Sequence, residues 1–129
     1  MTTKVNIKVG RESFLDMFIN SIEMGGSEEW FALSENDFHF VFDNKADEES
    51  WAESLFRLVY DEGHSFTVVH QNDDTDVLGV LSKKNFDKNL QIMAENHPQI
   101  FMDEFSGDGD AFTADMALQY LVMGEYVFA

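Results

Sequence analysis

The segment around which this chain must pack is Asp110-Ala-Phe-Thr-Ala-Asp-Met-Ala-Leu-Gln-Tyr-Leu-Val-Met-Gly-Glu-Tyr-Val-Phe-Ala129. Asp110 is a favourable helix N-cap, because its carboxylate can accept hydrogen bonds from the free N–H groups of the first turn. Nearly every residue from Met116 to Met123 is apolar, which predicts a helix buried over most of its circumference. Gly124 suits the C-terminal end of such a helix, and residues 125–129 are predicted to form a short β-type tail.

Length and composition indicate one domain, residues 1–129, that is large enough to bury a core without covalent cross-links. The absence of cysteine excludes disulfides and thiolate metal sites. The N-terminal residues lack the apolar run of a signal peptide, and no window is apolar for long enough to span a membrane. We therefore expect a cytoplasmic protein that does not contact membranes.

Acidity is the dominant feature of the composition. The chain has 25 Asp and Glu residues against 8 Lys and Arg residues, which leaves a formal net charge of −17. Neither Lys nor Arg occurs between Glu12 and Asn44, or from Asn89 to the end. Such a charge disfavours direct binding to nucleic acid and favours a basic partner surface. The alternative interpretation is a highly solvated surface, or adaptation to a salty cytoplasm.

Periodicity in the first half of the chain predicts two strands and two helices. Alternating apolar residues predict strands over 5–9 and 38–42, the second with Phe38, Phe40 and Phe42 on one face. Apolar residues at helical spacing predict helices over 11–24 and 47–60. The segment 27–30, after Gly25-Gly26, is predicted to be a short helical turn or an irregular link.

The second half is predicted to begin with a β-hairpin, with strands over 65–71 and 76–82 and a turn at 72–75. Ser82 is the expected cap of a third long helix, which Pro98 stops or kinks. A short helical piece over 99–105 precedes the terminal helix. This order of elements predicts an α+β fold, in which helices pack on a small, mostly antiparallel sheet.

Three motifs in this order resemble a family of small, largely uncharacterised proteins of tailed bacteriophages. They are Glu23-Met-Gly-Gly-Ser-Glu-Glu-Trp30, the pair Leu78-Gly-Val-Leu81 and Ala94-Glu-Asn-His-Pro98, and the terminal segment from Asp110 to Phe128. The chain departs from the family at Ala129, where the family usually ends in Gly, and in its greater acidity. The resemblance implies a phage gene product in the host cytoplasm, and it supplies neither a biochemical role nor an active site.

The sequence gives little support for a metal site. His64 and His70 lie at opposite ends of one predicted strand, near Asp73, Asp74 and Asp76, but no His-x-x-x-His spacing accompanies them. The pair Asp108 and Asp110 lacks the further ligands of a calcium loop.

Nucleophilic and phosphate-binding chemistry has no better support. The glycine pairs Gly25-Gly26 and Gly107/Gly109 lack a neighbouring Lys or Arg, so a phosphate loop is not indicated, and no serine lies in a nucleophile elbow. We therefore expect no cofactor, no metal and no enzymatic activity.

The predicted function is binding of a basic host or phage protein through an acidic face, as a nucleic-acid mimic or counter-defence inhibitor. Trp30 is a candidate apolar anchor for that partner, although the same ring could instead plug the edge of the core. The predicted partner-binding residues are Glu28, Glu29, Trp30, Glu35, Asp37, Asp47, Glu48 and Glu49.

Three alternatives remain open. The first is a sponge for a nucleotide signal, which would need a local basic cluster formed by Arg57, Lys83, Lys84 and Lys88. The second is an accessory protein of the virion or of its assembly. The third concerns the apolar terminal helix: a second copy would cover it in a homodimer if Leu118 and Leu121 were exposed in the monomer.

Overall fold

The structure is a computed structural model that describes residues 6–128, and it has the predicted α+β architecture. Its α-helices are α1 (Arg11–Glu23), α2 (Glu35–Asp43), α3 (Trp51–Phe56), α4 (Lys83–Asn96), α5 (Pro98–Ser106) and α6 (Ala111–Met123). Its shorter helical turns are the 3-10 turn η1 (Ser27–Glu29) and the π-helical turn η2 (Arg57–Asp61). Its strands are β1 (Phe31–Leu33), β2 (Phe66–His70) and β3 (Asp73–Leu81).

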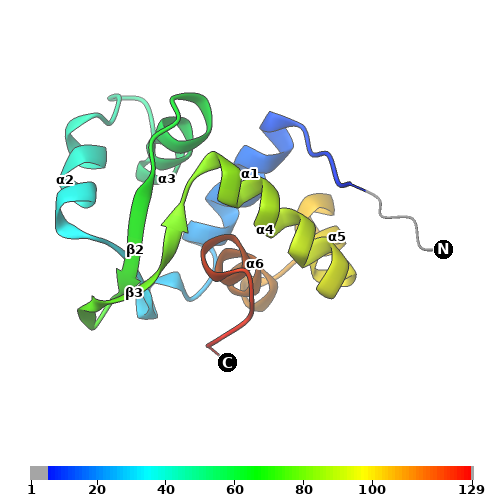
Figure 1. The fold of residues 1–129 in the computed structure, drawn as a ribbon. Coiled ribbons are helices and arrows are strands. Elements are labelled where there is room, and N and C mark those ends of the chain that lie inside the picture. Colours follow the sequence, from blue (N-terminus) through cyan, green and yellow to red (C-terminus); the bar gives the residue numbers. More distant parts are fainter. Residues whose placement is uncertain (1–5, 129) are drawn as a thin grey trace.

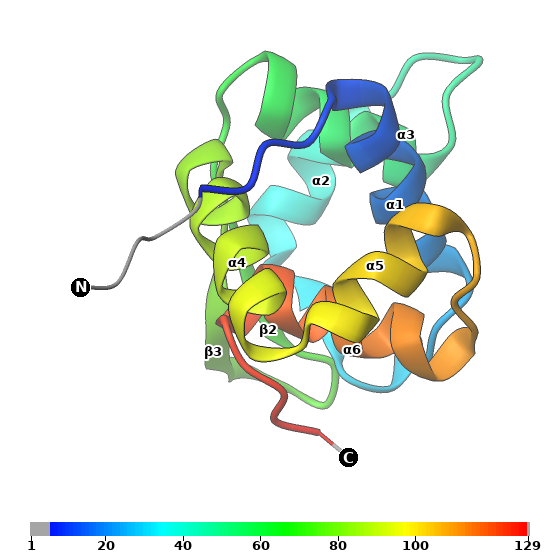
Figure 2. The same ribbon diagram turned by 90° about the vertical axis from the view of Figure 1, so that its right-hand side faces the viewer.

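The strands form one antiparallel sheet in the order β1-β2-β3. β2 and β3 make the predicted hairpin, but β3 begins at Asp73, so the turn lies at 71–72 and not at 72–75. Figure 1 shows this hairpin in the middle of the molecule, with α2 on one side and α4 and α5 on the other. Figure 2, turned by 90°, shows α5 in front and α2 behind it. α2 therefore lies at the end of the molecule opposite to α5.

The terminal helix α6 is the most buried element, as the sequence predicts. Asp110 caps it: its Oδ1 accepts a hydrogen bond from the N–H of Thr113 at 2.9 Å. Gly124 ends it with a φ of 73°, in the left-handed region that favours glycine. Leu118 and Leu121 are fully buried within the single chain. Because these two leucines are buried in the monomer, no second copy is needed to cover them.

α6 packs directly against β3 at Gly79, where the strand has no side chain. A Cβ added to Gly79 would lie 2.1 Å from the carbonyl oxygen of Val122, so no larger residue fits there without displacing the helix. On its other sides α6 contacts α1, α4 and α5. The helix is thus enclosed by elements from both halves of the sequence.

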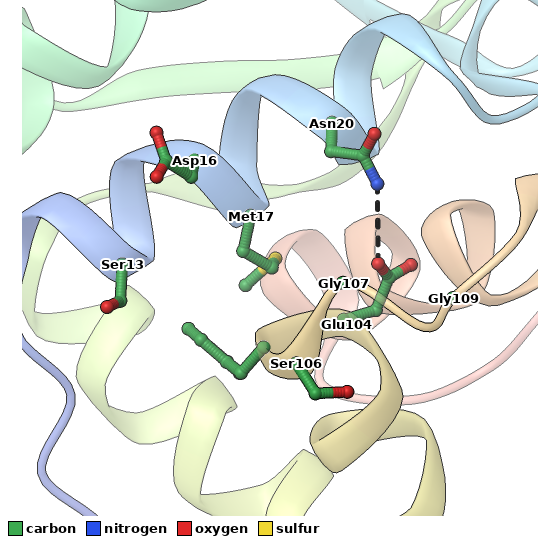
Figure 3. A pocket seen from close by; sticks show the side chains of 9 residues that line it. Ser13, Asp16, Met17, Asn20, Glu104, Ser106, Gly107 and Gly109 are labelled. Atoms are coloured by element: carbon green, nitrogen blue, oxygen red, sulfur yellow. Dashed lines mark hydrogen bonds between the residues drawn. The ribbon is translucent and has the colours of Figure 1, made fainter.

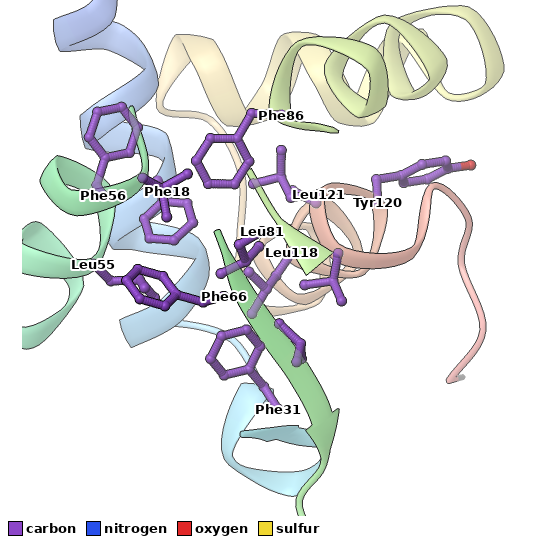
Figure 4. Close-up of a cluster of buried hydrophobic side chains, with 14 of the residues drawn as sticks. Phe18, Phe31, Leu55, Phe56, Phe66, Leu81, Phe86, Leu118, Tyr120 and Leu121 are labelled. Atoms are coloured by element: carbon purple, nitrogen blue, oxygen red, sulfur yellow. The ribbon is translucent and has the colours of Figure 1, made fainter. Parts of the chain in front are cut away.

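An aromatic cluster fills the space between α1, α3 and α4 (Figure 4). The rings of Phe18 and Phe56 lie 5.6 Å apart, and Phe86 lies 5.5 Å from Phe18. Phe14 meets Phe56 and Phe86 edge to face, at 5.3 and 5.2 Å. Edge-to-face pairs at these distances add to the stabilisation from buried area. Phe14, Phe18, Phe56 and Phe86 are each at most 1% exposed, so this cluster lies in the centre of the core.

The segment predicted as a strand over 38–42 is instead helix α2. Its alternating phenylalanines consequently do not share one apolar face, and Phe38, Phe40 and Phe42 are all exposed. Ser34 precedes the helix, and Asp37 in its first turn accepts a hydrogen bond from the N–H of Thr67 at 2.7 Å. This bond ties the start of α2 to β2, in a position where α2 cannot join the sheet.

The strand predicted over 5–9 is also wrong. Val5 lies outside the described residues, and residues 6–10 belong to no helix or strand. The N–H of Ile7 donates to Oε1 of Gln91 on α4 at 2.6 Å. This segment therefore lies along α4 and does not enter the sheet.

The tail after Gly124 is not a strand either, over residues 125–128 that the structure describes. The N–H groups of Val127 and Phe128 both donate to Oε1 of Gln119, at 2.9 and 2.7 Å. Gln119 Nε2 in turn donates to the Phe128 carbonyl at 2.9 Å. The buried amide of Gln119 thus holds the tail against α6, in place of a neighbouring strand.

Candidate functional site

Three large exposed apolar residues of the described chain, Phe38, Phe40 and Phe42, lie on α2. Phe38 and Phe42 are four residues apart, which places them on one side of the helix, and they are 45 and 63% exposed. Their rings stack, with centroids 6.4 Å apart. Phe40 points to another side, where it contacts His64 and Phe66. Val41 is the buried residue by which α2 is anchored to the core.

Trp51 extends this exposed aromatic surface onto α3. Ser50 caps α3, with its hydroxyl accepting from the N–H of Glu53 at 3.1 Å, so Trp51 is the first residue of the helix. Its ring lies 6.2 Å from that of Phe38. The indole Nε1 of Trp51 is buried and has no hydrogen-bond partner. We call Phe38, Phe42 and Trp51 the aromatic face.

A groove of about 400 Å³ runs between the aromatic face and strand β1. Its apolar lining consists of Ile22, Phe31, Ala32, Leu33, Phe38 and Trp51. Polar side chains, among them Glu28 and Gln71, complete the rim. We call this cavity the β1 groove. It is concave, mainly apolar and adjacent to carboxylates, which are properties of a surface that binds another molecule.

Carboxylates flank α2 at both ends. Glu28 and Glu29 lie in η1 and Glu35 in the first turn of α2, all of them exposed. Asp47 and Glu48 are exposed in the link 44–50, at the opposite end of α2 (Figure 1). A nine-residue helix is about 13 Å long, so Glu35 at its start lies roughly that distance from the link after its end. The five exposed acids predicted for the site therefore lie on three separate segments and do not form one cluster.

The other three predicted site residues are engaged within the fold. Trp30 is 3% exposed, and its Nε1 donates to Asp115 Oδ1 at 2.8 Å, so it is part of the core and not an exposed anchor. Asp37 accepts the bond from Thr67 described above.

Glu49 accepts hydrogen bonds from Arg57 Nε and Ser54 Oγ, both at 2.8 Å. The guanidinium of Arg57 lowers the pKa of Glu49 to about 2. The acids 47–49 precede α3 and do not begin it, because α3 starts at Trp51.

The sequence contains a signal for the aromatic face that strand periodicity concealed. Ser34 followed by Glu35 and Asp37 is typical of a helix N-terminus, where acids interact favourably with the helix dipole. In a helix that starts there, Phe38 and Phe42 fall on one side and Phe40 on another. Once this segment is recognised as a helix, the same residues therefore predict a stacked pair of Phe38 and Phe42.

A second cavity, of about 430 Å³, lies between α1, α5 and the loop before α6 (Figure 3). Glu104 is buried at its wall, where Oε2 accepts from Asn20 Nδ2 at 3.4 Å and Oε1 has no partner. Burial raises the pKa of this carboxyl group. Ser106 Oγ donates to the carbonyl oxygen of Asp103 and to Asp108 Oδ2. The distinctive group of this cavity is therefore the buried carboxyl group of Glu104, one oxygen of which has no partner.

Two of the four basic residues considered for an anionic ligand, Arg57 and Lys83, lie next to acids. Arg57 contacts both Glu49 and Glu62. Lys83 lies 3.7 Å from Asp87 and 4.1 Å from the centroid of the Tyr60 ring. Arg57 therefore contributes little free positive charge to such a site.

The candidate metal ligands are dispersed. His64 contacts Phe40 and Phe66, whereas His70 contacts Phe128 at the far end of β2. Among residues 6–128, no three His, Asp or Glu side chains are grouped closely enough to hold a metal ion. In the same part of the chain, the helices are too short or too polar to cross a bilayer. Comparison with protein families, curated proteins and solved structures finds no match to this chain.

Proposed function

We propose that this protein acts by binding a basic partner protein of the host or the phage, and not by catalysis. The observation that carries the proposal is the aromatic face: stacked, exposed rings of Phe38 and Phe42 next to Trp51. Exposed Glu35 lies on the same helix, and exposed Glu28 lines the β1 groove. Large apolar side chains exposed together, with a polar rim, mark interaction surfaces. The phage resemblance and the net charge of −17 fit an acidic effector of this kind.

Charge and aromatic contact have different roles in this proposal. The carboxylates create a long-range negative field, which accelerates encounter with a positive surface. Each exposed ion pair then contributes only about 0 to 1 kcal/mol. Affinity must come mainly from desolvated apolar anchors, for which aromatic residues are the usual choice. Phe38 and Trp51 take the role that the sequence assigns to Trp30.

The first experiment identifies the partner by proximity. A photoreactive phenylalanine analogue at position 42 is irradiated in host cells, and the cross-linked protein is identified by mass spectrometry. The same analogue at position 112 is the control, because Phe112 is 58% exposed but lies on α6. A basic protein captured from position 42 and not from position 112 supports the proposal.

The second experiment measures binding of the purified partner. The substitutions Glu28→Lys and Glu35→Lys should weaken binding much more than Asp108→Lys and Glu125→Lys, which change the net charge equally at exposed sites elsewhere. Raising the salt concentration should weaken the wild-type complex. Double-stranded DNA should displace this protein from the complex if it acts as a nucleic-acid mimic. Binding that responds equally to both charge-reversed variants contradicts the proposed surface.

A further inference from the structure

Strand β1 is an edge of the sheet. Its residues Phe31, Ala32 and Leu33 all line the β1 groove, and Phe31 and Leu33 are 8 and 7% exposed. The N–H of Gln71 donates to the Trp30 carbonyl at 2.9 Å, and the N–H of Ser34 donates to the Thr67 carbonyl at 3.0 Å. Backbone groups of an antiparallel strand alternate between its two sides. Residues 30, 32 and 34 therefore bond to β2, and the N–H and C=O groups of Phe31 and Leu33 point away from it.

The space beside this open edge already has the character of a binding groove. Phe31, Ala32 and Leu33 line it on one side, and Phe38 and Trp51 line it on the other. An unpaired backbone edge next to an apolar groove provides both hydrogen bonds and side-chain contacts, which is the combination used in recognition by strand addition.

We propose that the partner enters this groove as an extended basic segment that adds to β1 as a fourth strand. This inference rests on the proposed function and specifies its binding mode. Alternate side chains of the added strand would contact Phe38 and Trp51, while its Lys or Arg side chains would approach Glu28 and Glu35. Charge complementarity selects this occupant, because no Lys or Arg occurs between residues 12 and 44.

The same charges disfavour a second copy of this chain as the occupant. Two copies paired through β1 would bring Glu28 and Glu35 of each close to those of the other, which opposes association. β1 is also only three residues long, and short edges limit self-pairing. An added strand can therefore form only a few backbone hydrogen bonds, to Phe31 and Leu33. The aromatic face must supply part of the affinity.

The test uses synthetic peptides, beginning with acetyl-Lys-Val-Lys-Val-Lys-Val-Lys-amide. Two further peptides carry N-methyl groups, one on the Val amides and one on the internal Lys amides. In an extended peptide the Val amides lie on one edge and the Lys amides on the other. Only one edge can face β1, so one set of methyl groups blocks hydrogen bonds to β1 and the other set does not. We expect one N-methylated peptide to bind about tenfold more weakly than the other, from the loss of about two hydrogen bonds.

Two measurements on the protein locate the peptide. Amide exchange at Phe31 and Leu33 should slow when the unmodified peptide binds, with no change along β3. Phe38→Ser should weaken binding, whereas Phe112→Ser should not. Equal affinities of the two N-methylated peptides, absence of binding at millimolar peptide, or protection of Phe31 and Leu33 that grows with protein concentration alone would each overturn strand addition.

The outcomes also separate this inference from the proposed function. If the N-methylated peptides differ but salt and a Lys-to-Glu peptide have no effect, strand addition holds and the acidic partner surface fails. If binding depends on salt and on Glu28 and Glu35 but the two N-methylated peptides are equal, strand addition fails and the proposed function stands.

Discussion

The indole Nε1 of Trp30 donates a hydrogen bond to Asp115 Oδ1 at 2.8 Å, which joins the turn after α1 to the first half of α6. Asp115 also accepts from Gln119 Nε2 at 2.9 Å, and Gln119 holds the C-terminal tail. Gly25 permits this approach, since a Cβ there would lie 2.8 Å from the backbone nitrogen of Asp115. A short chain of polar contacts thus connects three segments that are distant in sequence.

Trp30→Phe should therefore destabilise the protein although it retains an aromatic ring. Hydrogen bonds to charged groups contribute about 1.5 to 3 kcal/mol, and we expect a loss in the free energy of unfolding within that range. Urea denaturation measures it. Glu29→Gln, one residue away and exposed, should change stability by less than about 0.5 kcal/mol. Equal stability of Trp30→Phe and the wild type would show that the bond to Asp115 contributes nothing.

Leu121→Ala tests the central position of α6. Leu121 is fully buried, so its truncation leaves a cavity and should cost about 2 to 5 kcal/mol. Glu48→Ala, at an exposed site in the link 44–50, should cost well under about 1 kcal/mol. Denaturant midpoints in the reverse order would contradict the assignment of these two residues to core and surface.

The terminal helix could be predicted from sequence because its signals are local and consistent. Asp110 and Gly124 mark its ends, and the apolar run between them has no plausible exposed arrangement. The cap at Ser82 and the end of α4 before Pro98 have the same local character. Such features depend on neighbouring residues, and the structure contains all of them.

Helix α2 was predicted wrongly although Ser34 and Glu35 are a local start signal, because its alternating phenylalanines have the period of a strand. A strand needs a neighbour, and the open side of β2 is occupied by β1, which has only three residues. Which segment pairs with β2 depends on tertiary contacts and not on the local sequence. The aromatic face depends on the same fact, since Phe38 and Phe42 stack only in a helix and Trp51 reaches them from α3.

Glu49→Gln should lower stability in a pH-dependent manner. The Arg57 guanidinium lowers the pKa of Glu49 from 4.5 to about 2, so ionised Glu49 stabilises the folded state. That stabilisation is present above pH 4.5 and is lost as the pH falls toward 2. The variant should be less stable by about 1.5 to 3 kcal/mol at pH 7. Denaturation at pH 7, 4 and 3 should show the deficit shrinking, and a constant deficit would contradict the ion pair as its cause.

Glu104→Gln should have the opposite pH dependence. Burial raises the pKa of Glu104 above 4.5, so the folded state favours the protonated form. Below pH 4.5 the group is protonated in both states, and the stability it supports is lost as the pH rises through its folded pKa. A neutral amide avoids this loss. The variant should therefore gain stability relative to the wild type between pH 4 and 7, and a gain that does not change with pH would exclude ionisation of Glu104 as its origin.

Phe42→Ser and Val41→Ala separate the binding surface from the fold. Phe42 is 63% exposed while its neighbour Val41 is fully buried, so the two residues face different surroundings on one helix. Val41→Ala should cost about 1 to 3 kcal/mol of stability, because it leaves a small cavity. Phe42→Ser should change stability by less than about 0.5 kcal/mol yet weaken binding of the basic partner. If Phe42→Ser instead destabilises the protein as much as Val41→Ala, the exposed ring supports α2 and the aromatic face loses its assignment as a binding surface.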